Sequence, residues 1–338
     1  MFVTDMGSTC RRGAWLVSAV LCFACSAEGF VGSAGALRGS VRVASAGAGV
    51  SLRPVVARAG RIGAAAVRLS AAAGSEAGTK VNVREQMHPT IGKLANILEE
   101  TMKEKLDLEP YVDRDAMDMM YVEGEDFIDG QRCVIQNSMW QSPEFRKIHI
   151  ECAIFLNSKG ERSGLDILHA VLFPRYGSVG PEVPMFGCDL VAMKGSISAA
   201  ICDLSPMTKE KKVPADYREA FEKRVGDLAK YATPRDVPEF GQSIFGDKCV
   251  FVRPADAAEN EQFLKMCKEI MSLHCDLAST RVGVPLSEEQ KEEAFEAQTY
   301  YCSQQSKNDK TTRILQQAFG NEWTDRYMKN ILFDAPKK

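Results

Sequence analysis

Four titratable residues lie inside apolar, strand-like stretches of the sequence, where an unpaired charge is costly. His149 and Glu151 belong to KIHIECAIFL, His169 to LDILHAVLF and Asp189 to MFGCDLVAM. Burying an ionisable group costs free energy unless the group is paired or used in chemistry. Because three successive stretches carry such groups, the sequence predicts a site that handles protons.

Strand geometry predicts which of these side chains can meet. Residues two apart in a strand point to the same face of a sheet, so His149 and Glu151 project together. His169 shares its face with apolar neighbours, and Asp189 follows Gly187, which we expect in a tight turn. If the three strands are neighbours, all four titratable side chains converge on one pocket.

Each of these residues alone also has an ordinary structural explanation. A single histidine on an apolar face is usually a hydrogen-bonded core residue, and acidic residues are rarely buried without a partner. Two chemistries fit the set as a whole. Two histidines with carboxylates could hold a non-haem metal ion, or the groups could form a proton relay in which neighbours separate the pKa values of an acid and a base. The pattern does not distinguish these two sites.

The remaining sequence predicts a sheet flanked by helices. Strand-like stretches cover residues 119–123, 131–140, 147–156, 165–173, 185–193, 196–204 and 248–254. Most connections between them are shorter than the dozen residues that a parallel crossover needs, so the sheet should be largely antiparallel. Helical periodicity covers residues 90–106, 213–231, 256–278, 286–306, 309–318 and 320–331. Helices grouped at the two ends of the chain predict an α+β fold with helices packed on the sheet faces.

The first 78 residues have the composition of a targeting leader. The apolar run at 14–25 follows two arginines and is shorter than the roughly 20 residues that span a membrane, so it predicts a signal peptide over about 1–29. From 30 to 75 there are arginines but no aspartate, glutamate or lysine, which is typical of a transit peptide. We therefore expect a bipartite leader over 1–78 that directs the chain to a complex plastid, and one domain over 79–338.

Composition limits the partners and cofactors of that domain. The chain has a net charge of -3 and its leader is basic, so residues 79–338 are acidic and unsuited to binding nucleic acid. The cysteines after the leader form no CxxC pair, and we interpret them as reduced, buried side chains rather than metal ligands. There is neither a GxGxxG nor a P-loop motif, so electrons for any redox reaction must come from elsewhere.

A second polar motif, SQQSKNDKTTR at 303–313, joins two predicted helices. It places Asn308, Asp309, Lys310 and Arg313 together, either as a helix cap or as a polar lid that faces the sheet. Arg235, in the segment RDVPEF, is another candidate for binding an anion. Taken alone, Arg235 has the simpler explanation of a surface charge.

Five segments resemble the ferredoxin-dependent bilin reductases. They are RKIHIECA, GLDILHAVLFP, PMFGCDLVA, SAAICDLSP and QQSKNDKTTRILQQAFGNEWTDRYMKNILFD, and the similarity runs from about Tyr121 to Asp334. The resemblance implies a three-layer α/β/α sandwich with a central, mainly antiparallel sheet. It also implies stepwise one-electron reduction of biliverdin IXα by ferredoxin, through bilin radicals and with no bound flavin, nicotinamide or metal.

The resemblance implies a role for each residue of the strand motifs. Asp189 matches an aspartate that contacts the pyrrole nitrogens and protonates the bilin, and His169 matches the histidine that shares a proton with it. Glu151 matches a glutamate beside the vinyl group of the D ring, and His149 lies near it. The combination of Glu151 with His169 implies four-electron reduction in two steps, with phycocyanobilin as the product.

The resemblance also implies how the bilin is bound. Asn308 and Asp309 match a pair of lid residues over the bilin, and Lys310 and Arg235 match cations that pair with its propionates. The alternatives are a two-electron or phycoerythrobilin-forming reductase, a non-catalytic bilin carrier and a metal-dependent enzyme.

The acidic domain must bind an acidic ferredoxin through a local basic patch. The candidates are Lys147, Lys159, Arg162 and the lysines at 209, 211 and 212, and the loop NSKGERSG that carries Lys159 and Arg162 is longer than expected. We expect a monomer without a membrane span after the leader.

Overall fold

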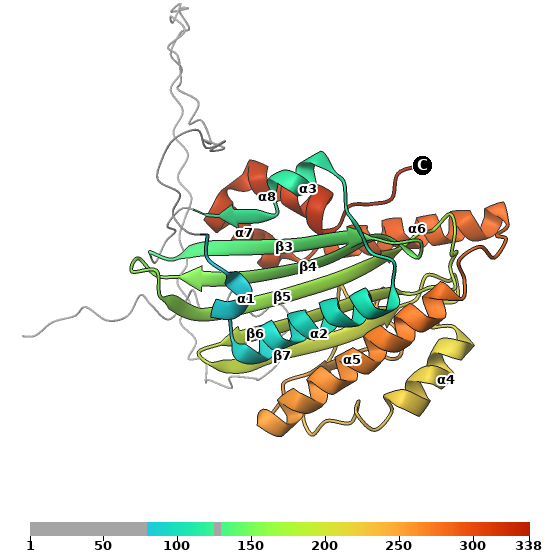
Figure 1. The fold of residues 1–338 in the computed structure, drawn as a ribbon, viewed down its shortest axis with the longest axis horizontal. Coiled ribbons are helices and arrows are strands. Elements are labelled where there is room, and N and C mark those ends of the chain that lie inside the picture. Colours follow the sequence, from blue (N-terminus) through green and yellow to red (C-terminus); the bar gives the residue numbers. More distant parts are fainter. Residues whose placement is uncertain (1–79, 125–129) are drawn as a thin grey trace, which may run out of the picture. The chain divides into compact units, whose positions relative to one another are not determined.

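The structure is a computed structural model that describes residues 80–124 and 130–338 (Figure 1). The predicted leader over 1–78 lies outside the described residues. Among the helices of the described part, none is long and apolar enough to pass through a bilayer.

The described strands form one sheet in which every pairing is antiparallel. They are β1 (Glu109–Pro110), β2 (Tyr121–Glu123), β3 (Arg132–Gln141), β4 (Phe145–Leu156), β5 (Arg162–Pro174), β6 (Met185–Met193), β7 (Ser196–Ser205) and β8 (Val250–Val252). Their order is β1-β3-β4-β5-β6-β7-β8, and β2 also pairs with β3. The prediction of an antiparallel sheet from short connections is therefore confirmed.

The turn between β6 and β7 shows why such short connections suffice. Lys194 and Gly195 have φ values of 53° and 80°, and Met193 pairs directly with Ser196. Positive φ at both central residues is the requirement of a type I′ turn, whose twist matches that of the strands it joins. Two residues are therefore enough to reverse the chain between β6 and β7.

Helices occupy both ends of the described chain, as expected. They are α1 (Val83–Gln86), α2 (Pro89–Lys105), α3 (Arg114–Asp118), α4 (Ala215–Arg224), α5 (Ala257–Ser279), α6 (Glu288–Gln305), α7 (Asp309–Phe319), α8 (Asn321–Tyr327) and the π-helical turn η1 (Met328–Leu332). The helix predicted over 213–231 is shorter than expected, and α1 and α3 were not predicted. Gly320, with φ of 82°, separates α7 from α8.

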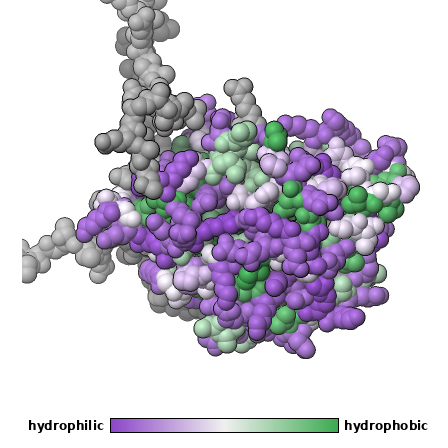
Figure 2. All heavy atoms as spheres, in the orientation of Figure 1, coloured by the Kyte–Doolittle hydropathy of each residue, from purple (hydrophilic) through white to green (hydrophobic). Residues whose placement is uncertain are grey.

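Two apolar cores lie on opposite faces of the sheet and make the fold a three-layer sandwich. Helices α2, α4 and α5 cover one face, where they share the larger core with alternate residues of β4 to β7 (Figure 1). Helices α6, α7 and α8 and η1 contribute to the core on the other face. The outward side of the α2 and α5 layer is mainly hydrophilic, with scattered apolar patches (Figure 2).

A buried ion pair attaches the C-terminal segment to β4. Lys147 is fully buried, and its Nζ lies 2.5 Å from Asp334 Oδ1 and donates to the backbone carbonyl of Ile331. Arg146 Nη1 lies 2.7 Å from the other carboxylate oxygen of Asp334. The prediction that Lys147 belongs to a surface patch for ferredoxin is therefore wrong, because this side chain points into the protein and neutralises Asp334.

We expect Asp334→Asn to destabilise the protein by about 3 kcal/mol, since removing one partner of a buried pair leaves an uncompensated charge. The free energy of unfolding in urea measures this loss. The matched control is Asp325→Asn, because Asp325 is 67% exposed and lies 3.3 Å from Lys329 on the surface. The control should cost less than about 1 kcal/mol, and equal losses in the two variants would contradict the assigned role of Asp334.

Candidate active site

Four polar side chains from adjacent strands lie in one row across the sheet. Asn137 on β3 pairs with Glu151 on β4, Glu151 pairs with His169 on β5, and His169 pairs with Asp189 on β6. Directly paired residues of antiparallel strands point to the same face. The structure thus brings together the titratable residues of three successive sequence stretches, with His149 two residues from Glu151 on the same face.

Gly187 does not form the tight turn that we expected before Asp189. It lies within β6, opposite Val171 on β5 and Asp203 on β7. Asp189 therefore owes its position to the register of a continuous strand.

His169 and Asp189 form a hydrogen-bonded pair in the middle of the row. His169 Nδ1 lies 2.6 Å from Asp189 Oδ1, and the two side chains are 13% and 18% exposed. Burial opposes a charge on His169, but the Asp189 and Glu151 carboxylates prevail and raise the pKa of His169 above its ordinary value. His169 Nε2 is buried and has no hydrogen-bond partner within the described part of the chain, so it can contact a bound ligand.

Glu151 holds its proton more tightly than an exposed glutamate. Its side chain is buried and accepts a hydrogen bond from the fully buried hydroxyl of Tyr327 on α8. Burial raises the pKa of Glu151, while His169 and the Tyr327 hydrogen bond act in the opposite direction. A carboxyl group with a raised pKa is suited to donate a proton near neutral pH.

His149 is held in one neutral form by Asn137. The amide Nδ2 of Asn137 donates to the backbone carbonyl of Met119 at 2.6 Å, which directs Asn137 Oδ1 towards His149 Nε2 at 2.8 Å. An amide oxygen only accepts, so His149 carries its proton on Nε2. Burial first, with the charges of Lys147 and His169, lowers the pKa of His149 well below its ordinary value.

The hydroxyl of Tyr327 lies between two acceptors. It is 3.0 Å from Asn137 Oδ1 and closer to Glu151 Oε2. When Glu151 is ionised, the hydroxyl donates to the carboxylate. When Glu151 is protonated, the carboxyl group can donate to the phenol oxygen and release the hydroxyl hydrogen to Asn137. The protonation state of Glu151 is thus coupled to the orientation of one hydroxyl group.

Three of the four titratable residues, Glu151, His169 and Asp189, line a cavity that opens to solvent. His149, which we expected in the same pocket, does not line it. Glu151, His169 and Asp189 come from the sheet, and Asn308 comes from the junction of α6 and α7 on the opposite side. Most of the remaining wall is apolar, and Phe333 packs edge-on against the His169 ring at 5.6 Å. Apolar walls with a few convergent polar groups are typical of sites for small organic molecules.

The other predicted binding residues lie outside this cavity lining. Asp309 is 76% exposed and lies 3.6 Å from Arg313, and Lys310 does not line the cavity. Arg235 lies at the β7–β8 edge of the sheet, where Nη1 donates to the carbonyl of Ser198 at 3.0 Å. Its guanidinium group lies 5.3 Å from the ring centre of Phe251.

Sequence analysis missed Asn137 and Tyr327. Asn137 carried a signal, because it is a polar residue within the strand-like stretch QRCVIQNSMW. Tyr327 carried none, since its hydroxyl reaches Glu151 from 176 residues away in the sequence.

The site residues do not gather as a metal-ligand set. Within residues 80–124 and 130–338, the only cluster of three or more potential ligand atoms is formed by three cysteines on the other face of the sheet. One ring nitrogen of each histidine is already used, by Asn137 for His149 and by Asp189 for His169. The geometry therefore favours the proton relay over the metal site.

Comparisons with known proteins match most of the described chain. The sequence model of the ferredoxin-dependent bilin reductase family matches residues 95–334. A phycocyanobilin:ferredoxin oxidoreductase of Trichodesmium erythraeum (strain IMS101) is 39% identical over 251 residues, which are 74% of this chain and 95% of the relative. One from Synechococcus elongatus (strain ATCC 33912 / PCC 7942 / FACHB-805) is 41% identical over 263 residues, covering 76% of this chain and 98% of the relative.

A solved structure shares the fold at low sequence identity. Phytochromobilin synthase from tomato, in complex with biliverdin, superposes with a TM-score of 0.57 at 15% identity, over 72% of this chain and 84% of that chain. The mixed α+β fold with a central antiparallel sheet is therefore shared with that protein. An N-terminal extension of about 80 residues lies beyond the cyanobacterial relatives, and such an extension is consistent with a targeting peptide.

We expect Tyr327→Phe to raise the pKa of Glu151 further, because the ionised carboxylate loses a hydrogen bond. A raised folded-state pKa means that the native protein holds a proton that the unfolded chain releases, so stability falls as pH rises through that pKa. In the variant this fall should continue to higher pH. Infrared titration of the protonated carboxyl band, identified by its loss in Glu151→Gln, measures the shift.

Tyr301→Phe is the matched control for this titration. Tyr301 is also buried, but its hydroxyl accepts from Gln305 at 2.9 Å. The carboxyl band should titrate as in the unmodified protein. An unchanged titration in Tyr327→Phe would show that the phenol does not control Glu151.

Proposed function

The chain belongs to the ferredoxin-dependent bilin reductase family, and we propose that it reduces biliverdin IXα to phycocyanobilin. Phycocyanobilin and ferredoxin both appear in the names of its relatives. The reaction adds four electrons and four protons to the bilin in two steps. Ferredoxin supplies the electrons one at a time, and the protein supplies the protons. The observation that carries this proposal is the row of Glu151, His169 and Asp189 along the wall of one cavity.

The His169–Asp189 pair is the first proton source. The two groups share a hydrogen bond of 2.6 Å, and the raised pKa of His169 favours a proton in the pair. Asp189 would donate to the bilin near its pyrrole nitrogens, and His169 would replace the lost proton. The unpartnered Nε2 of His169 is available to a ring carbonyl of the bilin.

Glu151 is the second proton source and acts on the vinyl group of the D ring. Burial raises the pKa of its carboxyl group, and a proton on this group can be transferred once an electron has increased the basicity of the vinyl carbon. Tyr327 then donates to the new carboxylate and stabilises it. His149 is neutral and held by Asn137, so we assign it a positioning role beside Glu151 rather than proton donation.

The binding roles of the lid residues follow from their positions. Asn308 is buried against the cavity and would contact the bilin directly. Asp309, Lys310 and Arg235 lie outside the cavity lining, so they would reach the bilin only at its periphery, where the propionates are hydrated.

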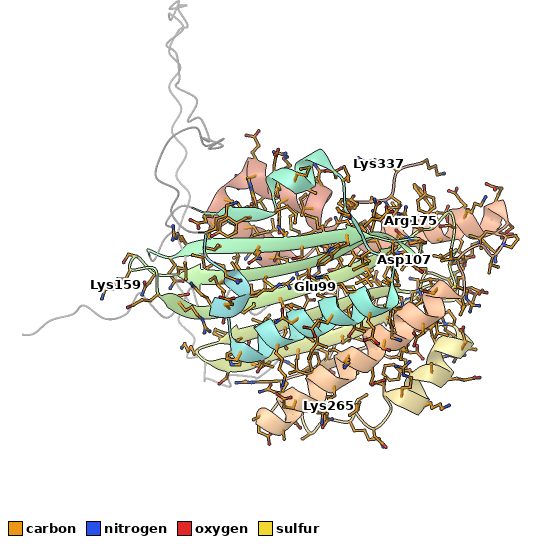
Figure 3. The ribbon with its side chains drawn as sticks, in the orientation of Figure 1. Glu99, Asp107, Lys159, Arg175, Lys265 and Lys337 are labelled. Carbon is orange, nitrogen blue, oxygen red and sulfur yellow. The ribbon has the colours of Figure 1, made fainter. Side chains whose placement is uncertain are left out.

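Ferredoxin would dock through exposed lysines. Lysines 209, 211 and 212 are exposed, and Lys209 contacts α6 through Glu289. Lys159 is exposed in the connection between β4 and β5 (Figure 3). Because the complex depends on opposite charges, turnover that does not change with ionic strength would contradict this docking.

We further propose that residues 1–78 direct the protein to a plastid and that 79–338 form the reductase domain, acting as a monomer. The start of the domain is supported by contacts of its first residues: Val81 N donates to the Tyr121 hydroxyl at 3.0 Å, and Val83 is fully buried. A fluorescent protein fused to residues 1–78 that stays in the cytosol would contradict the plastid address.

An anaerobic assay with biliverdin and reduced ferredoxin tests the proposed activity. We expect phycocyanobilin as the chromatographic product, with transient bilin radicals during turnover. A non-catalytic carrier would instead bind biliverdin without any spectral change. As a control, Asp189→Asn should still bind biliverdin but lose about 100-fold to 10,000-fold in rate, which is the usual contribution of acid–base catalysis.

Glu151→Gln tests whether the two proton sources act on different rings of the bilin. The amide cannot donate a proton, so the D-ring vinyl group should survive while the A-ring system is still reduced through Asp189 and His169. Mass spectrometry should show a product with two fewer hydrogen atoms than phycocyanobilin. The control is Glu161→Gln, in the exposed β4–β5 connection, which should give phycocyanobilin. Phycocyanobilin from Glu151→Gln would show that Glu151 does not donate the proton to the D-ring vinyl group.

A further inference from the structure

Three cysteine side chains meet on the face of the sheet opposite the cavity. Cys188 comes from β6, Cys202 from β7 and Cys267 from α5, and all three are fully buried. Their sulfur atoms all lie within 4.8 Å of one another, and Cys188 and Cys267 are 3.8 Å apart. No other group of three or more potential ligands is found in the part of the chain that the structure describes.

The strand register and the position of α5 create this cluster. Cys188 pairs directly with Cys202 across β6 and β7, so their side chains lie next to each other on one face. Since neighbours in a strand alternate, Cys188 points away from the face that carries Asp189. Cys267 belongs to the same apolar core, in which α5 packs on the sheet. Sequence spacing gave no hint of the cluster, because its members come from three separate elements.

The sulfur spacing matches the demands of a thiolate-bound ion. A metal–sulfur distance of about 2.3 Å places three sulfur atoms in a plane about 4 Å apart. The separation of 3.8 Å between Cys188 and Cys267 already fits, so small side-chain adjustments would complete a three-coordinate site.

The surroundings favour a soft monovalent ion over zinc. Structural zinc almost always has four ligands, and no fourth histidine, cysteine or carboxylate joins the cluster within the described residues. The core around the sulfur atoms is apolar, so a neutral complex is strongly preferred over a charged one. A monovalent ion bound by one thiolate and two neutral thiols forms a neutral complex, so one proton leaves the cluster on binding, and soft sulfur ligands select Cu(I).

We propose that Cys188, Cys202 and Cys267 form a binding site for a soft d10 cation of the Cu(I) type. The site lies behind the sheet and uses no residue of the bilin cavity, so it is independent of the proposed reductase activity. Because all three sulfur atoms are enclosed, the ion enters through local opening of the α5–sheet contact, and loading should be slow.

Anaerobic competition with the Cu(I) chelator bathocuproine disulfonate tests this site. The full chain also has Cys10, Cys22 and Cys25 in its leader, and the last two form a CxxC pair. All proteins in the test should therefore carry serine at these three positions. We expect this background protein to take one equivalent of Cu(I) from the chelator, and X-ray absorption should show three sulfur ligands at about 2.3 Å.

Cys202→Ala and Cys267→Val, each made in the same background, should lose this equivalent. Cys267→Val keeps most of the side-chain volume, and circular dichroism with urea unfolding checks that both variants are folded. The matched control is Cys275→Ala, because Cys275 is also fully buried on α5 but lies outside the cluster. The control should retain the equivalent.

Three results would overturn the proposal. The background protein could fail to take Cu(I) from the chelator, or a folded Cys202→Ala or Cys267→Val variant could retain the full equivalent. Loss of Cu(I) from Cys275→Ala would show that the ion binds elsewhere in the core.

Discussion

The cost of burying titratable groups is the constraint on which the candidate site depends. The register of β3 to β6 places Asn137, Glu151, His169 and Asp189 in one row, where most of their surface is removed from water. Such groups are tolerated only when each finds a partner. Most partners lie within the row or directly above it, so the polar network specifies one arrangement of side chains. Among the described residues, His169 Nε2 is a buried atom without a partner, and because His169 lines the cavity this nitrogen is available to a substrate.

The cost of burying charge also determines how the C-terminal segment is attached to the sheet. Phe333 and Tyr327 approach the row from the C-terminal segment, and Asp334 attaches that segment to β4 through Lys147 and Arg146. A buried lysine without this carboxylate would be strongly unfavourable. The ion pair therefore holds the segment that carries Tyr327 and Phe333 against β4.

Alternation along single strands was enough to predict the sheet and the face that carries Glu151, His169 and Asp189, because that information is local. Partners that arrive from distant elements could not be predicted. Lys147 illustrates the limit, since lysine is normally exposed and only the return of Asp334 to β4 makes its burial possible. Tyr327 and the three clustered cysteines were missed for the same reason. They meet their partners across layers of the fold, and no spacing in the sequence indicates such contacts.

The tautomer of His149 leads to an asymmetry within the site. A backbone carbonyl at Met119 orients the Asn137 amide, and that amide fixes the proton of His149 on Nε2. The amide oxygen that accepts this hydrogen bond carries no proton of its own to donate, so His149 cannot relay protons through Asn137. The candidate proton donors are therefore Glu151 and the His169–Asp189 pair, and Glu151 pairs directly with His169 across β4 and β5. The candidate donors form one continuous row along the cavity wall from β4 to β6, in line with a substrate that is protonated at more than one position.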